Sequence, residues 1–428
     1  NSKDMKPRNK KQQHIVELSG RLRPLTTPQM NWALNSTINH YGYRLKNGMC
    51  TCMKCGHEWL ETRNGTCLCP ECGTQIEIKD TKERVIREKS YFNIITTIED
   101  YQVVRMFLMI VEMRKGMKVK PAYLEIGQYF IDPKGNKTIV AIPRTLGCYV
   151  DTFAFSAPLE IRNDGDAYMY VSDQWVYPRI KVTDTIKRNG FKNSVHRIHP
   201  VTMFQELLTN PKAETLMKAN EIGLLRYLCA RPANKSDIDK YWNTIKIAKR
   251  NGYRVKDPQM WFDYIKMLER MGRNLNSPSL IAPNDLKVVH DIYVAKVNRQ
   301  RIKEQREKER QQAIKDKAKF EELKSRYFGM EMTDGEIEIH SIDTIDDYYK
   351  IGDKQSICCG TAKYYLKEDT LTLTAYIGNK QIATIEISLD DYHIIQCRAF
   401  ANEICEYTQQ IAGIINANKK MIAERKRA

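Results

Sequence analysis

The sequence predicts a multidomain α+β protein with a zinc ribbon, an antiparallel β-rich middle, a helical region and a C-terminal α+β unit. Three observations predict this order: two paired-cysteine motifs near the N-terminus, strand-like runs after residue 81, and leucines at helical spacing after residue 199. At roughly 150 residues per domain, 428 residues suffice for two or three domains with their own cores. Charged residues make up 28% and hydrophobic residues 42%, which is typical of a folded chain.

Residues 1–45 are expected to form a basic N-terminal arm and a short helix. The basic residues of the arm are Lys3, Lys6, Arg8, Lys10 and Lys11. The helix is expected over 28–40, because Thr26 and Thr27 precede it and Thr is a common N-cap residue. The first residues lack the apolar stretch of a secretory signal and an initiating Met, which indicates a trimmed or partial start.

Residues 46–80 are expected to form a zinc ribbon. The segment contains two Cys-x-x-Cys-Gly motifs, and the thirteen residues between Cys55 and Cys69 suffice for a short hairpin. In each motif a tight turn, closed by Gly, lets two thiolates face one metal ion. The expected ligands of a tetrahedral Zn²⁺ are Cys52, Cys55, Cys69 and Cys72. Four protein ligands leave no open position, so we expect structural zinc whose binding largely folds the segment.

Three further residues are alternative ligands in the same segment. Cys50 and Cys67 each precede one motif by two residues, and His57 follows the first motif. Either cysteine could replace a ligand, but packing against Trp59 or the hairpin is the simpler expectation.

The spacing of the cysteines indicates the cellular compartment, and the net charge indicates the kind of partner. Six of the twelve cysteines lie within 50–72 at metal-binding spacing, and no secretion signal is visible, so we expect a reducing, cytoplasmic compartment. No apolar run reaches about 18 residues, so no membrane span is expected.

Lys and Arg outnumber Asp and Glu by 69 to 52, giving a net charge of +17. This excess favours a polyanionic partner such as nucleic acid over ordinary solubility charge.

Residues 81–185 are expected to form a twisted antiparallel sheet. The expected strands are the apolar, β-branched runs at 91–97, 103–113, 123–131 and 138–142. Asp132-Pro133-Lys134-Gly135-Asn136, between the last two runs, is typical of a hairpin turn. Another turn is expected at 163–166 and a short strand at 168–171.

The rest of the chain is expected to be helical and then mixed. Residues 186–298 place Leu207, Leu216, Leu224 and Leu228 at helical spacing, with prolines between the segments. Residues 299–327 contain neither Gly nor Pro and are expected to form one charged, exposed helix, most simply a spacer.

Residues 328–428 are expected to form a compact α+β unit. Its expected elements are strands at 336–342, 370–377 and 382–389 and a helix at 401–422 with a basic end.

Three stretches of the C-terminal unit carry a family resemblance. They are 358–365 (CCGTAKYY), 382–389 (IATIEISL) and 395–402 (IQCRAFAN). They resemble PcfJ-like proteins, encoded on conjugative plasmids, integrative elements and phages, whose pattern is His-Cys-Val, Tyr-Tyr, Thr-Ile-Glu and Gln-x-Arg-Gly-x-x-Asn. Residues 241–291 also look like the longer Bacteroidales members, which carry an N-terminal pair of cysteine knuckles. The resemblance implies a mobile-element context and a PcfJ-like α+β unit, but no particular reaction.

The sequence departs from this family pattern at three places. Ile357 stands where the pattern has His, Ala399 stands where it has Gly, and a basic residue is missing near Tyr376. If the family's His, Cys and Arg perform chemistry, this chain has lost part of the set.

Polar residues on successive elements of the C-terminal unit form the candidate catalytic set. They are Cys358, Glu386, Gln396, Arg398 and Asn402. An enzyme could use Cys358 as a nucleophile or Glu386 as a base, although His393 is the only His nearby in the sequence. The same residues could instead line a binding pocket. The simplest interpretation is a buried hydrogen-bond network in which Glu386 pairs with Arg398.

A second candidate surface is basic and belongs to the helical region. Its residues are Lys246, Lys249, Arg250 and Arg254, which we expect to contact nucleic acid. Aromatic residues interleave with them and could stack on bases, but at helical spacing we expect these rings to form core. His196 and His199 are a weak metal-binding pair, because no carboxylate or cysteine accompanies them.

These observations favour non-enzymatic nucleic-acid binding, to RNA or DNA, in a plasmid, transposon or phage setting. The expected mechanism is contact between phosphates and Lys or Arg, with zinc holding one module in shape. One alternative is a nucleic-acid-processing enzyme that uses the C-terminal polar residues. The other is a protein-interaction scaffold of a DNA-transfer or defence complex.

Overall fold

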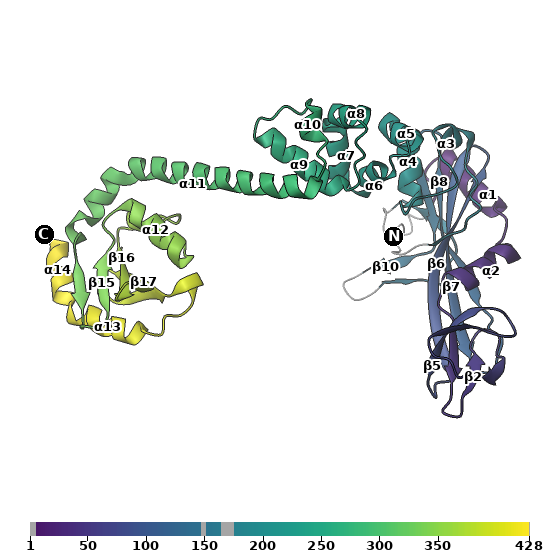
Figure 1. Ribbon diagram of the computed structural model, residues 1–428, viewed down its shortest axis with the longest axis horizontal. Coiled ribbons are helices and arrows are strands. Elements are labelled where there is room, and N and C mark those ends of the chain that lie inside the picture. Colours follow the sequence, from purple (N-terminus) through teal and green to yellow (C-terminus); the bar gives the residue numbers. More distant parts are fainter. Residues whose placement is uncertain (1–5, 147–150, 164–174, 428) are drawn as a thin grey trace. The chain divides into compact units, whose positions relative to one another are not determined.

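The computed structural model describes residues 6–146, 151–163 and 175–427, and it confirms a mixed α+β, multidomain chain (Figure 1). Two compact units account for it: Asn1–His290 and Asp291–Ala428. The finer division into six segments stays a prediction. Among the helices of the described residues, none is both long and apolar enough to cross a membrane.

Two helices open the first unit. Helix α1 (Lys10–Arg21) covers part of the stretch expected to be an arm, because Asn9 caps it: Asn9 Oδ1 accepts a hydrogen bond from Gln12 N at 2.9 Å. Ile15 on α1 is fully buried. Helix α2 (Thr27–Ser36) follows Thr26, whose backbone N–H donates to Gln29 Oε1 in a capping box, and it ends before the expected residue 40.

The cysteine segment belongs to a five-stranded sheet in the order β3-β2-β1-β5-β4. The strands are β1 (Tyr41–Arg44), β2 (Met49–Cys52), β3 (Glu58–Leu60), β4 (Thr66–Leu68) and β5 (Gln75–Asp80). Strand β1 pairs antiparallel with β2 and parallel with β5, so it joins the two cysteine hairpins. Gly42 allows this close pairing, because a Cβ there would lie 2.8 Å from Cys50 Sγ.

A six-stranded sheet follows, in the order β12-β9-β8-β7-β6-β13. Its strands are β6 (Val85–Ile98), β7 (Tyr101–Arg114), β8 (Ala122–Ile131), β9 (Lys137–Ala141), β12 (Glu160–Arg162) and β13 (Trp175–Val176). Neighbours are antiparallel, as predicted, except that β13 pairs parallel with β6. The predicted turn joins β8 to β9, where Gly135 N donates to Asp132 O at 2.9 Å.

Strands β10 (Arg144–Leu146) and β11 (Asp151–Phe153) form a separate pair. Residues 164–171 of the expected turn and strand lie outside the described residues.

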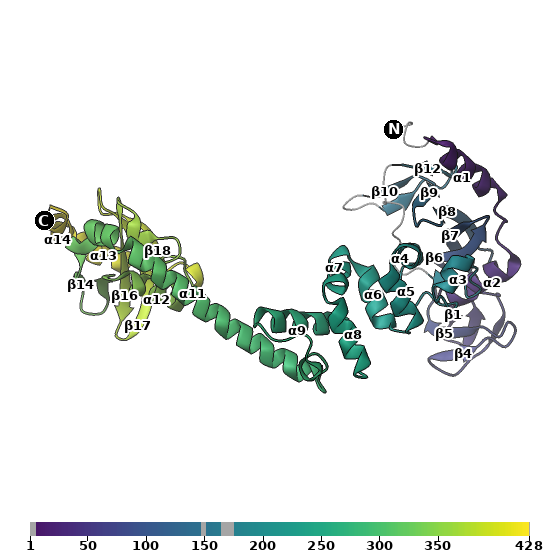
Figure 2. The same cartoon turned by 90° about the horizontal axis from the view of Figure 1, so that it is seen from above.

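Short helices make up the remainder of the first unit, as predicted (Figure 2). They are α3 (Asp184–Arg188), α4 (Pro200–Thr209), α5 (Pro211–Lys218), α6 (Ile222–Ala230), α7 (Pro232–Lys240), α8 (Trp242–Arg250), α9 (Pro258–Arg270) and α10 (Pro278–Ile281). Proline begins several of them, a position where its missing N–H costs no helical hydrogen bond. Gln205 on α4 donates to Gly135 O at 2.8 Å, which ties these helices to the sheet.

Helix α11 (Leu286–Lys324) is the expected charged helix, and it begins earlier than residue 299. Few of its residues are buried, and these include Phe320 and Lys324 near its end. Polar side chains along it pair at i,i+4, as Gln305 does with Glu309 at 2.7 Å.

The second unit is built on an antiparallel sheet in the order β14-β15-β16-β17-β18. Its strands are β14 (Glu331–Thr333), β15 (Glu338–Ser341), β16 (Thr370–Ile377), β17 (Lys380–Ser388) and β18 (Ile394–Arg398), and its helices are α12 (Ile345–Gln355), α13 (Thr408–Ala417) and α14 (Lys419–Arg427). The prediction of one helix over 401–422 was wrong at its start and at its centre. Ala401 and Asn402 have φ of 53° and 67°, and α-helical structure begins only at Thr408 and is divided at Asn418.

The two faces of this sheet differ in chemistry although both are largely buried. Leu371, Leu373 and Ile385 pack with Ile411 and Ile415 of α13 in one apolar core. Residues on the opposite face are polar and buried: Thr372, Thr374, Thr384 and Glu386. Because adjacent strand residues point to opposite faces, the alternating sequences of β16 and β17 create this division.

Candidate functional site

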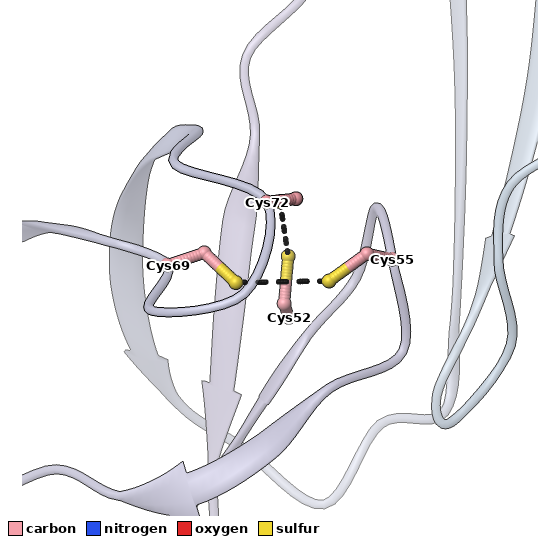
Figure 3. Close-up of side chains that lie close together, drawn as sticks. All are labelled: Cys52, Cys55, Cys69 and Cys72. Carbon is pink, nitrogen blue, oxygen red and sulfur yellow. Dashed lines mark hydrogen bonds between the residues drawn. The ribbon is translucent and has the colours of Figure 1, made fainter.

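Four cysteine side chains meet at the tips of two hairpin turns in the five-stranded sheet (Figure 3). Cys52 and Cys72 Sγ are 3.9 Å apart, Cys55 and Cys69 Sγ are 3.6 Å apart, and all four lie within 4.8 Å of one another. A tetrahedral ion with bonds to sulfur of about 2.3 Å would hold its sulfurs about 3.8 Å apart. The four-cysteine set can therefore hold a metal ion and is compatible with a zinc ribbon.

The two turns repeat one local geometry. Gly56 N donates to Cys52 O at 2.9 Å, and Gly73 N donates to Cys69 O at 2.9 Å. Both glycines have positive φ, 84° and 65°, a conformation that costs other residues energy. The Gly after each Cys-x-x-Cys pair therefore closes its turn, as the sequence predicts.

One thiol of the four-cysteine cluster, that of Cys72, has a lowered pKa. Burial raises the pKa of Cys72, but hydrogen bonds with Thr74 and neighbouring thiols outweigh this and lower it to about 7. Burial raises the pKa of Cys55. The thiolate is the metal-binding form, so metal capture must displace protons from the other sulfurs.

The alternative ligands lie outside the four-cysteine cluster. Cys50 is fully buried and pairs across the β2–β3 ladder with Trp59, and Cys67 is buried on β4. Burial raises the pKa of Cys50 to about 11. His57 stacks on Trp59 with ring centroids 6.0 Å apart. The structure thus places these residues in packing, outside the four-cysteine cluster.

The first cysteine turn supports a basic loop between β7 and β8. Val119 N donates to Lys54 O at 2.9 Å, and a Cβ on Gly56 would lie 2.7 Å from Gly116 C. The cations of this region are Arg84, Lys115, Lys118 and Lys120. None of these four forms an ion pair with a described residue, and Lys115 is half-buried while the others are exposed. Sequence reasoning missed this loop, although the run RKGMKVK at 114–120 is visible.

The predicted basic residues of the helical region lie on and just after α8. Lys246, Lys249, Arg250 and Arg254 are exposed, and none of them forms an ion pair with a described residue. Arg254 donates to Asn220 O at 3.3 Å.

Most of the aromatic rings near α8 are core, as the sequence favours. Tyr241, Trp261, Phe262 and Tyr264 are buried, while Trp242 is half-buried and lies beneath Lys212. The buried rings are therefore not free to stack on bases.

The pair His196 and His199 shows no metal geometry. Neither joins a group of three or more candidate ligands among the described residues. Burial lowers the pKa of His196, and His199 precedes α4 as its N-cap.

The second unit brings all five residues of the candidate catalytic set to one cavity of about 270 Å³. We call this cavity the polar pocket. Its lining residues are Ser356, Ile357, Cys358, Cys359, Tyr364, Thr372, Thr384, Glu386, Gln396, Arg398 and Asn402. Whether any of them acts in catalysis stays a prediction.

Strand register builds the floor of the polar pocket. Glu386 on β17 lies opposite Thr372 on β16 and Gln396 on β18. In the next row, Thr384 lies opposite Arg398. Because residues two apart share one face, both rows project to the polar side of the sheet.

The roof of the polar pocket comes from the segment after α12. Ile357 N donates to Gly352 O and Tyr364 N donates to Cys359 O, at 2.9 and 3.0 Å. A Cβ on Gly360 would lie 2.9 Å from Tyr349 Cα, so only Gly allows the segment to approach α12. The roof places Cys358 exposed and Cys359 buried, and burial raises the pKa of Cys359 to about 11.

The expected ion pair between Glu386 and Arg398 is not formed, which corrects the sequence interpretation. Glu386 instead accepts from Lys367 Nζ at 2.5 Å, Gln396 Nε2 at 2.6 Å and Thr370 Oγ1 at 3.0 Å. Lys367 was not among the predicted site residues, because it lies before β16 rather than on the strands. A buried hydrogen-bond network around Glu386 is present, but its cation is Lys367 and not Arg398.

Some groups of the polar pocket have no such partners. Thr372 Oγ1 and Thr384 Oγ1 are buried without a hydrogen-bond partner among the described residues, and Arg398 forms no ion pair with a described residue. Thr372 and Thr384 were missed by sequence reasoning, although the alternation TLTLT at 370–374 and the pattern ATIE at 383–386 place Thr on the face of Glu386.

Comparison with known proteins concerns mainly the second unit. Residues 260–412 match the family model described as PcfJ-like protein, which confirms the resemblance inferred for the C-terminal unit; residues 241–259 and the cysteine segment lie outside the match. No curated protein and no solved structure matched the chain.

Proposed function

Because the chain carries a PcfJ-like region, we propose that it is a zinc-containing nucleic-acid-binding protein of a mobile genetic element and that it binds without catalysis. The observation that supports this proposal most is a set of exposed cations on and just after α8, which we call the α8 surface and which form no ion pair with a described residue: Lys246, Lys249, Arg250 and Arg254. Cations already paired with carboxylates contribute little to binding phosphates, whereas unpaired ones can release condensed counterions from nucleic acid.

The metal in this proposal is Zn²⁺ with a structural role. Four thiolates at tetrahedral separation, with no water or carboxylate position, are typical of structural zinc sites. The bound ion would fix the first cysteine turn, and that turn holds the β7–β8 loop through the hydrogen bond between Val119 and Lys54. The loop carries Lys115, Lys118 and Lys120, so zinc would help to present a second set of cations.

Contact with the sugar–phosphate backbone explains the arrangement better than base recognition. The α8 surface offers Lys and Arg, but the large rings Trp261 and Phe262 nearby are fully buried. Contacts to phosphates position a protein on nucleic acid without reading its sequence. We therefore expect weak sequence preference and strong salt dependence.

The first experiment is purification without added nucleic acid, followed by the A260/A280 ratio and digestion of bound material with RNase or DNase. Co-purifying polymer that salt releases would support the proposal and identify RNA or DNA. A clean preparation that also fails to retard RNA and DNA at low salt would refute it. Protein partners captured in a salt-insensitive manner would then favour the scaffold.

A matched pair of triple variants tests whether the α8 surface binds nucleic acid. The triple variant Lys246→Gln, Lys249→Gln and Arg250→Gln should reduce the slope of log K against log salt by about 2–3, at roughly 0.7–0.9 per lost phosphate contact. The control replaces Lys212, Lys240 and Lys266 by Gln, because these three already pair with Asp239, Glu269 and Asp237. Equal slopes for the two triple variants would indicate that net charge, and not the α8 surface, governs binding.

An enzyme is the second candidate, favoured by the convergence of the five predicted residues on the polar pocket. Two observations count against it. Glu386 is already engaged by Lys367, and Ile357 lines the pocket where the family pattern has His. His393 bonds to Asp391 and does not line the pocket. Loss of a nucleic-acid-processing activity in Glu386→Ala or Cys358→Ala, with folding intact, would support the enzyme.

A further inference from the structure

The polar pocket of the second unit has the features of a built ligand site, independent of nucleic-acid binding by the first unit. Its floor is a buried sheet face made of Thr and Glu instead of apolar residues. Polar groups lose hydration when buried, so a fold normally pairs each of them or leaves it for a ligand.

Some polar groups of the pocket have hydrogen-bond partners within the protein, and others remain available to a ligand. Glu386 is satisfied by Lys367, Thr370 and Gln396. Thr384 is 6% exposed, and its Oγ1 has no hydrogen-bond partner among the described residues. A buried hydroxyl of this kind can donate to an acceptor that enters the pocket.

The charges of the lining favour an anion. The carboxylate of Glu386 is neutralised by the ammonium of Lys367 at 2.5 Å. Arg398 is half-buried in the lining and forms no ion pair with a described residue. The uncompensated charge of the polar pocket is therefore positive, and a guanidinium is the side chain best suited to two parallel hydrogen bonds with an oxyanion.

Several residues in or next to the lining of the polar pocket have a strained, left-handed backbone conformation. Ser356 and Asn402, which line the pocket, have φ of 53° and 67°, and the neighbouring Lys363 and Ala401 have φ of 53°. The pairing of β17 with β18 also shifts register at Glu386. Left-handed non-glycine residues and bulges gather at functional sites, where they aim particular side chains.

We propose that the polar pocket binds a small phosphate-containing anion. In this proposal Arg398 pairs with the phosphate oxygens, and Thr384 Oγ1 and the Asn402 side-chain amide donate to them. A volume of about 270 Å³ lies just below the roughly 300–1,000 Å³ of pockets for drug-sized ligands, so the ligand is a phosphate group with at most a small substituent. The source is either a free phosphorylated small molecule or a terminal phosphate of a short oligonucleotide.

Cys358 provides a reporter within the polar pocket. Its thiol is exposed and lines the cavity, whereas Cys359, Cys397 and Cys405 of the same unit are buried. The experiment measures the rate of alkylation of Cys358 by iodoacetamide in the full-length protein, by peptide mass spectrometry, at constant ionic strength. Inorganic phosphate is titrated against chloride, and a 5′-phosphorylated dinucleotide is compared with its dephosphorylated form. Cys229, in the first unit, is the internal control.

Phosphate should slow the alkylation of Cys358 saturably, by about tenfold at ten times Kd, and leave Cys229 unchanged. Protection by both probes would indicate that the pocket accepts a substituted phosphate, and protection by inorganic phosphate alone would indicate a free ion. Equal rates in phosphate and chloride would overturn the proposal. The readout needs no nucleic acid polymer, so its failure leaves the function proposed for the first unit untouched.

Two variants separate a ligand site from an incidental cavity. Arg398→Gln should abolish the protection, while Lys380→Gln, the same charge change at an exposed position of β17, should retain it. Thr384→Val keeps the shape but removes the unpartnered hydroxyl, so the thermal stability of the second unit should be unchanged or higher while protection weakens. Full protection in Arg398→Gln and Thr384→Val would show an adventitious ion only.

Discussion

Two cysteines that are close in the sequence can lie in different surroundings, because a shift of one or two residues changes the direction of the side chain. Cys69 belongs to the four-cysteine cluster at the tip of a turn, while Cys67, two residues earlier, is buried on β4. The sequence favoured this distinction without settling it, since Cys-x-x-Cys is the usual spacing of zinc ligands but Cys50 and Cys67 stayed open as alternatives.

We expect Cys69→Ala to lose bound metal and Cys67→Ala to keep it. Removal of a ligand opens the tetrahedral site, and the loss of affinity should exceed the roughly 10–100-fold typical of changes beyond the ligands. Cys67→Ala removes only a small buried side chain and should cost about 1 kcal/mol of unfolding free energy. Metal content per chain, measured by inductively coupled plasma mass spectrometry, checks this. One bound metal in both variants would show that Cys69 is not a ligand.

Lys324 is a buried cation that the sequence could not identify, because it stands in a run of exposed charges. It is 1% exposed, and its Nζ donates to Lys367 O at 2.5 Å and also to Thr370 O. Burial lowers its pKa to about 8.

The stability conferred by Lys324 should rise with pH. Between about pH 8 and 10.5 the unfolded state binds more protons at this site than the folded state, so unfolding becomes less favourable as pH rises. The free energy of unfolding of the wild type minus that of Lys324→Met should increase by up to about 3 kcal/mol over this window, at 1.36 kcal/mol per pKa unit. Urea unfolding of both proteins at several pH values measures it. A difference independent of pH would mean that the folded pKa of Lys324 is not lowered.

At the scale of elements, alternation predicts strands but not what covers them. The run TLTLT on β16 correctly indicated a strand, and its buried Thr face became visible only with α12 and the roof segment in place. Register explains why Glu386 has Gln396 and not Arg398 as its partner: Glu386 lies opposite Gln396, and Arg398 lies opposite Thr384. Register follows from turns and bulges that the sequence does not show directly.

The expected helix at 401–422 failed for a local reason. Arg398 and Ile404 form a β-bridge, and Ala399 N donates to Glu403 O at 2.9 Å. These pairings hold Ala401 and Asn402 in the left-handed conformation, which ends any helix there. Helix propensity is weak enough for such tertiary pairing to override it.

The contact between α12 and the roof segment should make Gly360→Ala destabilising. A Cβ there would lie 2.9 Å from Tyr349 Cα, which belongs to the backbone and cannot rotate away. We expect a loss of about 1–3 kcal/mol in unfolding free energy, as for other overpacked sites. Gly413→Ala is the control, since Gly413 is exposed on α13 with nothing within 4 Å, and it should gain about 0.5–1 kcal/mol. Thermal unfolding of both variants checks this, and equal effects would show that the roof is not tightly packed.

At the scale of the molecule, the order of ribbon, sheet, helices and C-terminal unit could be predicted because each has its own periodicity or motif. The sequence could not show that β1 joins both cysteine hairpins, because parallel pairing of β1 with β5 leaves no local signal. Nor could it show that the cysteine turn supports the β7–β8 loop, since this contact joins residues distant in the chain.

The division into two units predicts that metal removal acts on one of them alone. The four cysteines belong to the first unit, and the polar pocket belongs to the second. Structural zinc supplies about 10–16 kcal/mol of apparent binding free energy in small zinc-finger peptides, so a chelator should open the five-stranded sheet. Because Val119 N donates to Lys54 O beside Cys55, the β7–β8 loop should lose its order as well.

Hydrogen–deuterium exchange before and after chelation measures this separation. Amide protection should fall in β1 to β5 and at 115–120, and it should persist in β16 and β17. The variant Cys69→Ala should reproduce the pattern without chelator, which excludes a direct effect of the chelator on the protein. Protection lost equally in β16 and β17 would mean that the two units unfold as one. Protection unchanged at 115–120 would mean that the basic loop does not depend on the metal, and that zinc shapes the ribbon without presenting Lys115, Lys118 and Lys120 to nucleic acid.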